Sequence, residues 1–337
     1  MSGTVVDESA RDSDISPTAP KLTAPVDESA DTGVPRAARG RSWTTALPGL
    51  AAILVSTGAF GLHALRYGRW IVDDAAITFA YARSIADGHG VVQQAGAPRV
   101  EGVSNPLWTA LFIPLKWVGL FDSGGTVAGW PDYAVVPKVL GTLCFAGTLA
   151  VLWWAFRGLV GRHAWLATLF TGLGLAAIPS YVIWAVSGLE NPLYGLLVAA
   201  LAAVTVRAVT DNRLTSARVA VLTGALALLA ALTRPDGLVY VGAYPLLLLA
   251  LLTRERLWAS VRAGLISVLT FGLPMGAFLL ARHDMFGLWL PNTAVAKGQQ
   301  GVTLAGFAKL DVLLSYVTWP VVLITVAVVG LAIGATA

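Results

Sequence analysis

The chain has 337 residues, of which 56% are hydrophobic and 12% are charged, and its mean hydropathy is +0.71. Soluble domains carry roughly a quarter charged residues, so the composition excludes an ordinary soluble protein and predicts a polytopic α-helical membrane protein. The net charge is only +4 and the basic residues are spread among loops, whereas a nucleic-acid partner would require a clustered basic face.

Residues 1–41 are rich in Ser, Asp, Ala, Thr and Pro and contain no Phe, Trp or Tyr. Such a segment cannot bury enough apolar surface to offset the entropy that ordering would cost. We therefore predict a disordered cytoplasmic tail over residues 1–41 and a transmembrane domain over residues 42–337.

Eight hydrophobic runs follow the tail, most of them long enough to cross a hydrocarbon core of roughly 30 Å. They are Ala46–Leu65, Tyr133–Phe156, Ala164–Val186, Leu189–Ala208, Ser216–Leu232, Leu238–Leu252, Trp258–Ala281 and Val312–Ala335. Short basic loops follow the even-numbered runs, which marks those loops and the N-terminus as cytoplasmic. The prediction is an all-α, multi-pass plasma-membrane protein with about eight transmembrane helices and a large first extracytoplasmic loop, residues 67–132, that carries juxtamembrane helices.

Four polar segments interrupt the apolar sequence: Trp70–Trp108, Ser187–Pro192, Thr233–Leu238 and Arg282–Lys297. They follow the first, third, fifth and seventh runs, so all four fall on the same side of the membrane. This arrangement predicts a site built from all four segments at the outer membrane–water interface.

Asp73 and Asp74 begin a helical pattern in which Ile77, Tyr81 and Ile85 share one face. One aspartate is suited to cap the helix, because a carboxylate accepts hydrogen bonds from the free backbone N–H groups of a first turn. The other is then a candidate general base. The pair does not specify a metal site, although its oxygens would suit a divalent cation.

Other polar residues of the first loop also have two interpretations. Arg83 can bind phosphate through its planar guanidinium or form an ion pair with Asp87 one turn later. Ser104 or Asn105 can cap the short apolar helix that follows, and Glu101 is either a solvated loop carboxylate or part of the site.

The three later segments add further candidates. Glu190 precedes a helix, where a carboxylate is favourable in itself. Arg234 ends an apolar run, so it needs a partner, either Asp236 or a bound anion. Additional polar residues crowd the loop after the seventh run: Arg282, His283, Asn292 and Lys297.

Taken in order, these motifs resemble the GT-C superfamily of membrane glycosyltransferases. The resemblance rests on Asp73 and Asp74 with Ile77–Arg83, Gly88–Gly90, Val100–Trp108, Trp184 with Ser187–Glu190, Thr233–Gly237, and Leu290–Thr293 with Ala296 and Lys297. Within the superfamily, the sequence resembles the actinobacterial terminal β-(1→2) arabinofuranosyltransferases.

The resemblance implies a polyprenyl-phosphate sugar donor and an envelope polysaccharide or glycolipid acceptor. It also implies an aspartate of the first loop as base, which falls on Asp73 or Asp74, with Asp74 as first choice. Arg234, Arg282 and Lys297 become candidates for contacts with the donor phosphate. Arabinofuranose is the favoured sugar and mannose the second, and a divalent cation is the only cofactor considered.

Two other classes of function remain open at this point. A lipid or solute transporter or flippase would keep ionisable residues near the bilayer midplane, whereas the charges here gather at the ends of the runs. A truncated, non-catalytic GT-C-like subunit is the other alternative, because Ala80 stands where the superfamily commonly has arginine and the chain stops as the eighth run ends.

Overall fold

The computed structural model describes residues 41–289 and Asn292, with side chains described from residue 46 onward. The expected disordered tail, the eighth hydrophobic run and Lys297 lie outside these residues. The described part is mostly helical, in agreement with an all-α class, and its strands are a short antiparallel hairpin of β1 (Thr126–Val127) and β2 (Trp130–Pro131).

Four helices are apolar and long enough to cross a membrane: α1 (Arg41–Leu65), α4 (Asp132–Leu159), α7 (Asn191–Thr210) and α10 (Leu257–Phe286). Three shorter apolar segments accompany them: α5 (Ala164–Ala177) with α6 (Pro179–Ala185), α8 (Ala217–Thr233), and η3 (Pro235–Gly242) with α9 (Ala243–Ala250). Among residues 41–289 the count is therefore four spans, or five if α5 and α6 form one. The expected eight are not confirmed.

The third hydrophobic run is not one straight helix as the sequence suggested. Its two parts, α5 and α6, meet at an angle of 84°. Ile178 between them is extended, with φ −83° and ψ 110°, and it precedes Pro179. The proline ring disfavours a helical conformation in the preceding residue and removes a backbone donor, so the break follows from the sequence.

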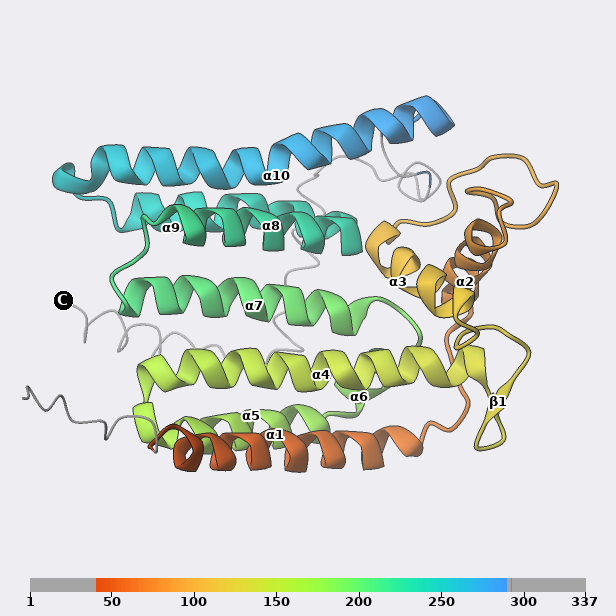
Figure 1. Ribbon diagram of the computed structural model, residues 1–337, viewed down its shortest axis with the longest axis horizontal. Helices are drawn as coiled ribbons and strands as arrows, with labels where there is room; N and C mark the ends of the chain where they lie inside the picture. The colour runs from red at the N-terminus through yellow and green to blue at the C-terminus, as the bar shows by residue number, and fades with distance from the viewer. Residues whose placement is uncertain (1–40, 290–291, 293–337) are drawn as a thin grey trace, which may run out of the picture. The chain divides into compact units, whose positions relative to one another are not determined.

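Small residues allow the long helices to pack closely, α4 against α7, α7 against α8 and α8 against α10 (Figure 1). A Cβ at Gly224 in α8 would lie only 2.3 Å from the carbonyl oxygen of Ser267 in α10. The hydroxyls of Thr223 and Ser267 share a hydrogen bond of 3.2 Å at the same crossing. Close approach at small residues is a usual way for helices to associate in a membrane.

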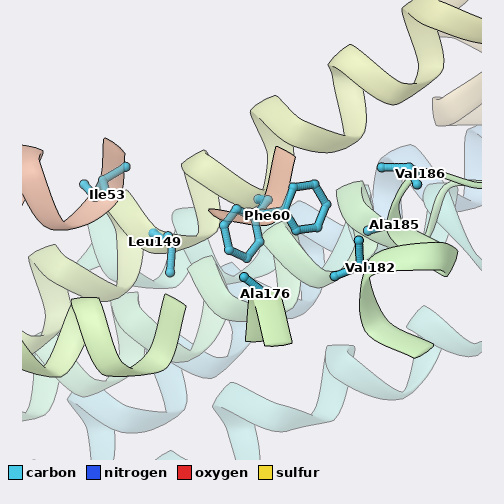
Figure 2. Close-up of a cluster of buried hydrophobic side chains, with 8 residues drawn as sticks. Ile53, Phe60, Leu149, Ala176, Val182, Ala185 and Val186 are labelled. Carbon is cyan, nitrogen blue, oxygen red and sulfur yellow. The ribbon is translucent and has the colours of Figure 1, made fainter. Parts of the chain in front are cut away.

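Aromatic packing attaches α1 to the other helices. The rings of Phe60 and Phe145 are stacked with centroids 4.4 Å apart. The same cluster, which Figure 2 shows, includes Ile53, Leu149, Ala176, Val182, Ala185 and Val186. The contacts join α1 to α4, α5 and α6.

The first loop is folded rather than an extended solvated connection. Its helices α2 (Asp73–Ala86) and α3 (Pro106–Trp117) lie at one end of the long helices, between the ends of α4 and α10, and the hairpin lies at the same end (Figure 1). Phe79, Trp108, Phe112 and Phe121 form a buried aromatic core between them, with neighbouring centroids about 5 Å apart. We call this end of the helices the α2–α3 end.

Candidate functional site

The four polar segments meet at the α2–α3 end. The N–H of Val72, just before α2, donates to the carbonyl of Ser187 at 2.9 Å. Glu190 accepts hydrogen bonds from both the first loop and the segment after α8. Arg282, near the end of α10, contacts the first loop. Segments as far apart in sequence as Glu101 and Arg282 thus contribute to one polar region.

Asp73 and Asp74 form the first turn of α2, and both are exposed. Neither aspartate is the N-cap residue that the sequence predicted, because Val72 occupies this position and makes no side-chain capping hydrogen bond. The Asp73 carboxylate accepts a hydrogen bond of 3.1 Å from the backbone N–H of Asp74. Neither carboxylate has a cationic partner among the described residues, so both are accessible at a helix N-terminus, where the helix dipole favours negative charge.

Gly188 fixes the start of α2 against the loop that carries Glu190. Its φ of +93° lies in the left-handed region that favours glycine. A Cβ at this position would lie 2.9 Å from the Cβ of Ala75. The indole N–H of Trp108 also donates to the Gly188 carbonyl at 3.0 Å. The loop and the first turn of α2 are therefore held together by both backbone conformation and packing.

Lys138 is a site residue that the sequence interpretation missed. It lies in the second turn of α4, and its Nζ donates to the carbonyls of Trp70 at 2.6 Å and Val186 at 2.9 Å. These carbonyls belong to the chain leading into α2 and into the Ser187–Glu190 loop. A lysine inside an apolar run was the available signal, since such a charge is costly without a role.

Asn105 joins α2, α3 and α7 through its side chain. Its amide donates to the carboxylate of Glu190 at 2.8 Å and to the hydroxyl of Thr78 at 3.1 Å, while its Oδ1 accepts from Thr109 at 3.1 Å. Asn105 occupies the N-cap position of α3, yet its side chain makes no capping hydrogen bond. The expected cap position of Asn105 is thus confirmed, but its side chain connects elements and does not make the capping hydrogen bond.

Arg234 connects this network to the end of α8. Its Nη1 lies 3.1 Å from Glu190 and 2.8 Å from the side chain of Asn191, and its Nε lies 3.0 Å from Asp236. The expected pair with Asp236 is observed, and Glu190 is a second carboxylate partner. Because Glu190 is itself buried, the arginine compensates a carboxylate removed from water.

Glu101 is buried and is not a solvated loop carboxylate. The Nε of Arg282 lies 2.8 Å from its Oε1, and both side chains are at most 8% exposed. This contact is an ion pair by distance, while the Nε–H makes no hydrogen bond of good geometry with the described residues. The backbone N–H of Asn292 lies 3.3 Å from the other Glu101 oxygen. Glu101 therefore holds the end of α10 and the segment after it against the first loop.

Tyr81 positions the loop around Glu101. Its hydroxyl donates to the carbonyl of Val100, and a Cβ at Gly102 would lie 2.7 Å from its ring. Burial raises the pKa of the Tyr81 phenol, a backbone hydrogen bond with Gly102 opposes this shift, and the charge of Glu101 adds to it. The phenol thus remains a hydrogen-bond donor at neutral pH.

Two of the expected site residues, Arg83 and His283, make their contacts with other residues. Arg83 forms an ion pair with Asp122 rather than with Asp87, which lies 3.8 Å from Lys116. Arg83 is nine residues beyond Asp74, which corresponds to roughly 14 Å along the axis of α2. His283 is exposed and stacks on Trp289 with centroids 4.3 Å apart.

Among the residues that the structure describes, no group of three or more His, Cys, Asp or Glu side chains could hold a metal ion. The two carboxylates of Asp73 and Asp74 could supply oxygen ligands, which divalent cations such as Mg²⁺ prefer. The remaining ligands would then have to come from the substrate or from water.

Comparisons with known proteins give one clear similarity. The chain is 32% identical over 239 residues to a terminal β-(1→2)-arabinofuranosyltransferase of Mycobacterium tuberculosis (strain ATCC 25618 / H37Rv). The alignment covers 69% of this chain and 36% of that protein, so the chain spans about a third of the relative's length. No family model and no solved structure matches the chain. The similarity supports a relationship to membrane glycosyltransferases.

Proposed function

We propose that this chain is a GT-C-type membrane glycosyltransferase that moves a sugar from a polyprenyl-phosphate donor to a cell-envelope glycan or glycolipid. Arabinofuranose is the favoured sugar, and mannose is the second. The observation that carries the proposal is the exposed carboxylate pair at the start of α2. Lys138 and Gly188 hold the chain around this pair against the Glu190 loop, at one end of apolar helices.

The position of the pair suits a lipid-linked donor. A polyprenyl phosphate keeps its chain in the hydrocarbon and its phosphate at the headgroup plane, so the transferase must bring its reactive groups to that plane. Asp73 and Asp74 begin α2, a short helix at one end of the long apolar helices (Figure 1). A nucleotide sugar, being soluble, would not require this arrangement.

The proposed reaction is a single displacement. The Asp74 carboxylate takes the proton of an acceptor hydroxyl, and the hydroxyl oxygen attacks the anomeric carbon of the donor sugar. The bond from that carbon to the phosphate oxygen breaks, and the polyprenyl phosphate leaves with the bonding electrons. Cationic side chains would stabilise the charge on the departing phosphate.

Arg234, Arg282 and Lys297 are the candidates for that stabilisation. Arg234 is the best placed among the described residues, since its side chain is 35% exposed while Arg282 is buried against Glu101. Glu190 would then orient Arg234 rather than contact the sugar. Asn292 reaches the site through its backbone contact with Glu101.

The orientation in the membrane is part of the proposal. We place the α2–α3 end outside the cytoplasm and the opposite ends of the helices inside. Arginines in the short loops at the opposite ends support this orientation by the positive-inside rule; they include Arg157, Arg162, Arg213, Arg218, Arg254 and Arg256. In this arrangement residues 1–41 form a cytoplasmic tail of the transmembrane domain.

The test is sugar transfer in membranes that contain the full chain. Membranes are incubated separately with radiolabelled polyprenyl-phospho-arabinose and polyprenyl-phospho-mannose, and the product is identified. We expect transfer from the arabinose donor, its loss in Asp74→Asn, and its retention in Asp87→Asn, a matched change at the other end of α2. Transfer from neither donor, or normal turnover by Asp74→Asn, would contradict the proposal.

A further inference from the structure

A cavity lined by two arginines lies at the opposite end of the helices from the candidate site. Its volume is about 410 Å³, and it opens where the end of α4, the start of α5 and the first part of α1 meet. Its lining includes Arg157, Arg162, Trp153, Trp165 and Pro48. We propose that this cavity binds the phosphate headgroup of an anionic membrane phospholipid. The proposal does not depend on the transferase activity.

The two arginines of the cavity are available to an anion. Arg157 lies in the last turn of α4 and Arg162 in the short 3-10 helix η2 (Gly161–His163), and both are exposed. Neither has a carboxylate within 4.0 Å among the described residues. By contrast, the neighbouring Arg207 donates to Asp211 at 3.0 Å. The cavity therefore presents two guanidinium groups whose N–H donors suit phosphate oxygens.

The backbone brings these two arginines to one cavity. Gly161 has a φ of +55°, in the left-handed region that favours glycine. The turn at this residue ends α4 and begins η2, which is followed directly by α5. As a result Arg157 and Arg162, five residues apart, line the same space.

Two tryptophans, Trp153 and Trp165, line the cavity beside the arginines. The guanidinium carbon of Arg157 lies 5.4 Å from the centre of the Trp153 ring, a cation–π arrangement that orients the charged group. A Cβ at Gly49 would lie 2.1 Å from the Trp153 indole, so this glycine lets α1 pass directly over the ring. Tryptophan is enriched at membrane interfaces, where its ring has both apolar and polar surroundings.

The location of the cavity favours a membrane lipid as the ligand over a soluble phosphate compound. The cavity sits where apolar α4 ends at Leu159 and apolar α5 begins at Ala164, so a ligand held there has hydrocarbon directly beside it. Basic pockets between helices at a membrane surface bind anionic headgroups in this way. The volume also falls in the range of roughly 300–1,000 Å³ that small-molecule sites occupy.

The test measures phospholipid binding by the purified full chain in neutral detergent, using native mass spectrometry. Phosphatidylglycerol is titrated, with phosphatidylcholine as the zwitterionic comparison. We expect Arg157→Gln/Arg162→Gln to weaken phosphatidylglycerol binding at least tenfold and to leave phosphatidylcholine binding unchanged. Arg213→Gln/Arg218→Gln is the matched control, because it removes the same charge from two exposed residues, Arg213 in the α7–α8 connection and Arg218 in the first turn of α8.

Three outcomes would overturn the proposal: wild-type affinity in the cavity variant, an equal loss in the control variant, or equal binding of the two lipids by the wild type. A separate arm adds glycerol phosphate and inorganic phosphate. If either displaces phosphatidylglycerol at similar concentration, the site binds soluble phosphate and the lipid assignment is wrong. The single change Arg162→Glu in the exposed turn is the second variant, should the double variant not fold.

Discussion

The side-chain amide of Asn105 donates a 2.8 Å hydrogen bond to the carboxylate of Glu190, although the two residues lie 85 positions apart. The same carboxylate contacts Arg234 at 3.1 Å. The three side chains form a continuous polar connection from the first loop, through the start of α7, to the end of α8. This connection gives Asn105 a role that its position before a helix did not suggest.

Replacing Asn105 should therefore destabilise the protein more than replacing its neighbour. Asn105→Ala leaves buried oxygens of Glu190 and Thr78 without a partner, which typically costs about 1–3 kcal/mol. Ser104→Ala, at the adjacent position, should change stability by about 0.5 kcal/mol or less. Denaturant unfolding of both purified variants in detergent measures the difference. Equal stabilities would show that the Asn105 side chain acts as an ordinary loop residue.

Glu101 and Arg282 should prove strongly coupled. Each side chain is at most 8% exposed, and removing one partner of a buried pair typically costs about 3–5 kcal/mol, because the other charge stays buried. We expect Glu101→Gln and Arg282→Met each to be destabilising, and the double variant to be much less destabilised than the sum. A double-mutant cycle of unfolding free energies measures the coupling. If the two losses of unfolding free energy were strictly additive, the two side chains would lie close together without stabilising the protein through their interaction.

Gly188→Ala tests whether the loop against α2 requires glycine. The change places a Cβ 2.9 Å from Ala75 at a backbone φ of +93°, and such a conformation costs a non-glycine residue about 1–3 kcal/mol. Gly195→Ala in α7 is the matched control, because its new Cβ meets nothing within 4 Å. It should be neutral or stabilising by up to about 1 kcal/mol. If the melting temperature fell equally in the two variants, position 188 would have no special requirement for glycine.

Much of this arrangement could be predicted from the sequence. Composition and apolar runs predicted helical membrane segments, and the alternation of polar segments predicted that four of them share one end. Hydrophobic runs do not report helix breaks reliably, however, and the run through Ile178 and Pro179 was interpreted as one span despite the proline. The α8 helix and the η3–α9 stretch are apolar but shorter than the four long helices, so the structure leaves the expected count of eight spans unconfirmed.

Side-chain partners were less predictable than helices. Arg83 has an acidic residue one turn away, yet it pairs with Asp122 across the loop, because tertiary packing sets which charge comes nearest. Asn105 and Glu101 had adequate local explanations and were found in long-range contacts instead. A local pattern cannot reveal such partners, since each depends on a segment that follows a different helix.

Lys138 should act as a positioning residue for the aspartate pair. Lys138→Met removes the donors that hold the carbonyls of Trp70 and Val186, so the start of α2 and the Glu190 loop lose a shared anchor. We expect the rate at saturating donor to fall by an order of magnitude or more, since small displacements of reacting groups can cost about 100-fold. Lys116→Met in α3 is the control and should retain the rate.

Two further readouts separate positioning from a general loss of folding. The amount of folded Lys138→Met protein should match the wild type. It is measured by size-exclusion chromatography after the membranes are solubilised in detergent. Lys138→Arg should recover part of the rate, because a guanidinium also donates to carbonyl oxygens. A rate loss that simply follows the loss of folded protein would assign Lys138 to stability alone.

The two aspartates should differ in their effect on catalysis. The Asp73 carboxylate already accepts the backbone N–H of Asp74 at 3.1 Å, whereas no hydrogen bond of the Asp74 carboxylate appears among the described residues. Asp74 is therefore the better candidate for taking a proton from an acceptor.

General-base catalysis contributes typically 10²–10⁴-fold, so Asp74→Asn should lower the transfer rate by about that factor. Asp73→Asn should lower it less, because an asparagine oxygen still accepts the same backbone N–H. The measurement is the initial rate at saturating donor in membranes with equal amounts of each variant, and a greater loss in Asp73→Asn would reverse the assignment of the base.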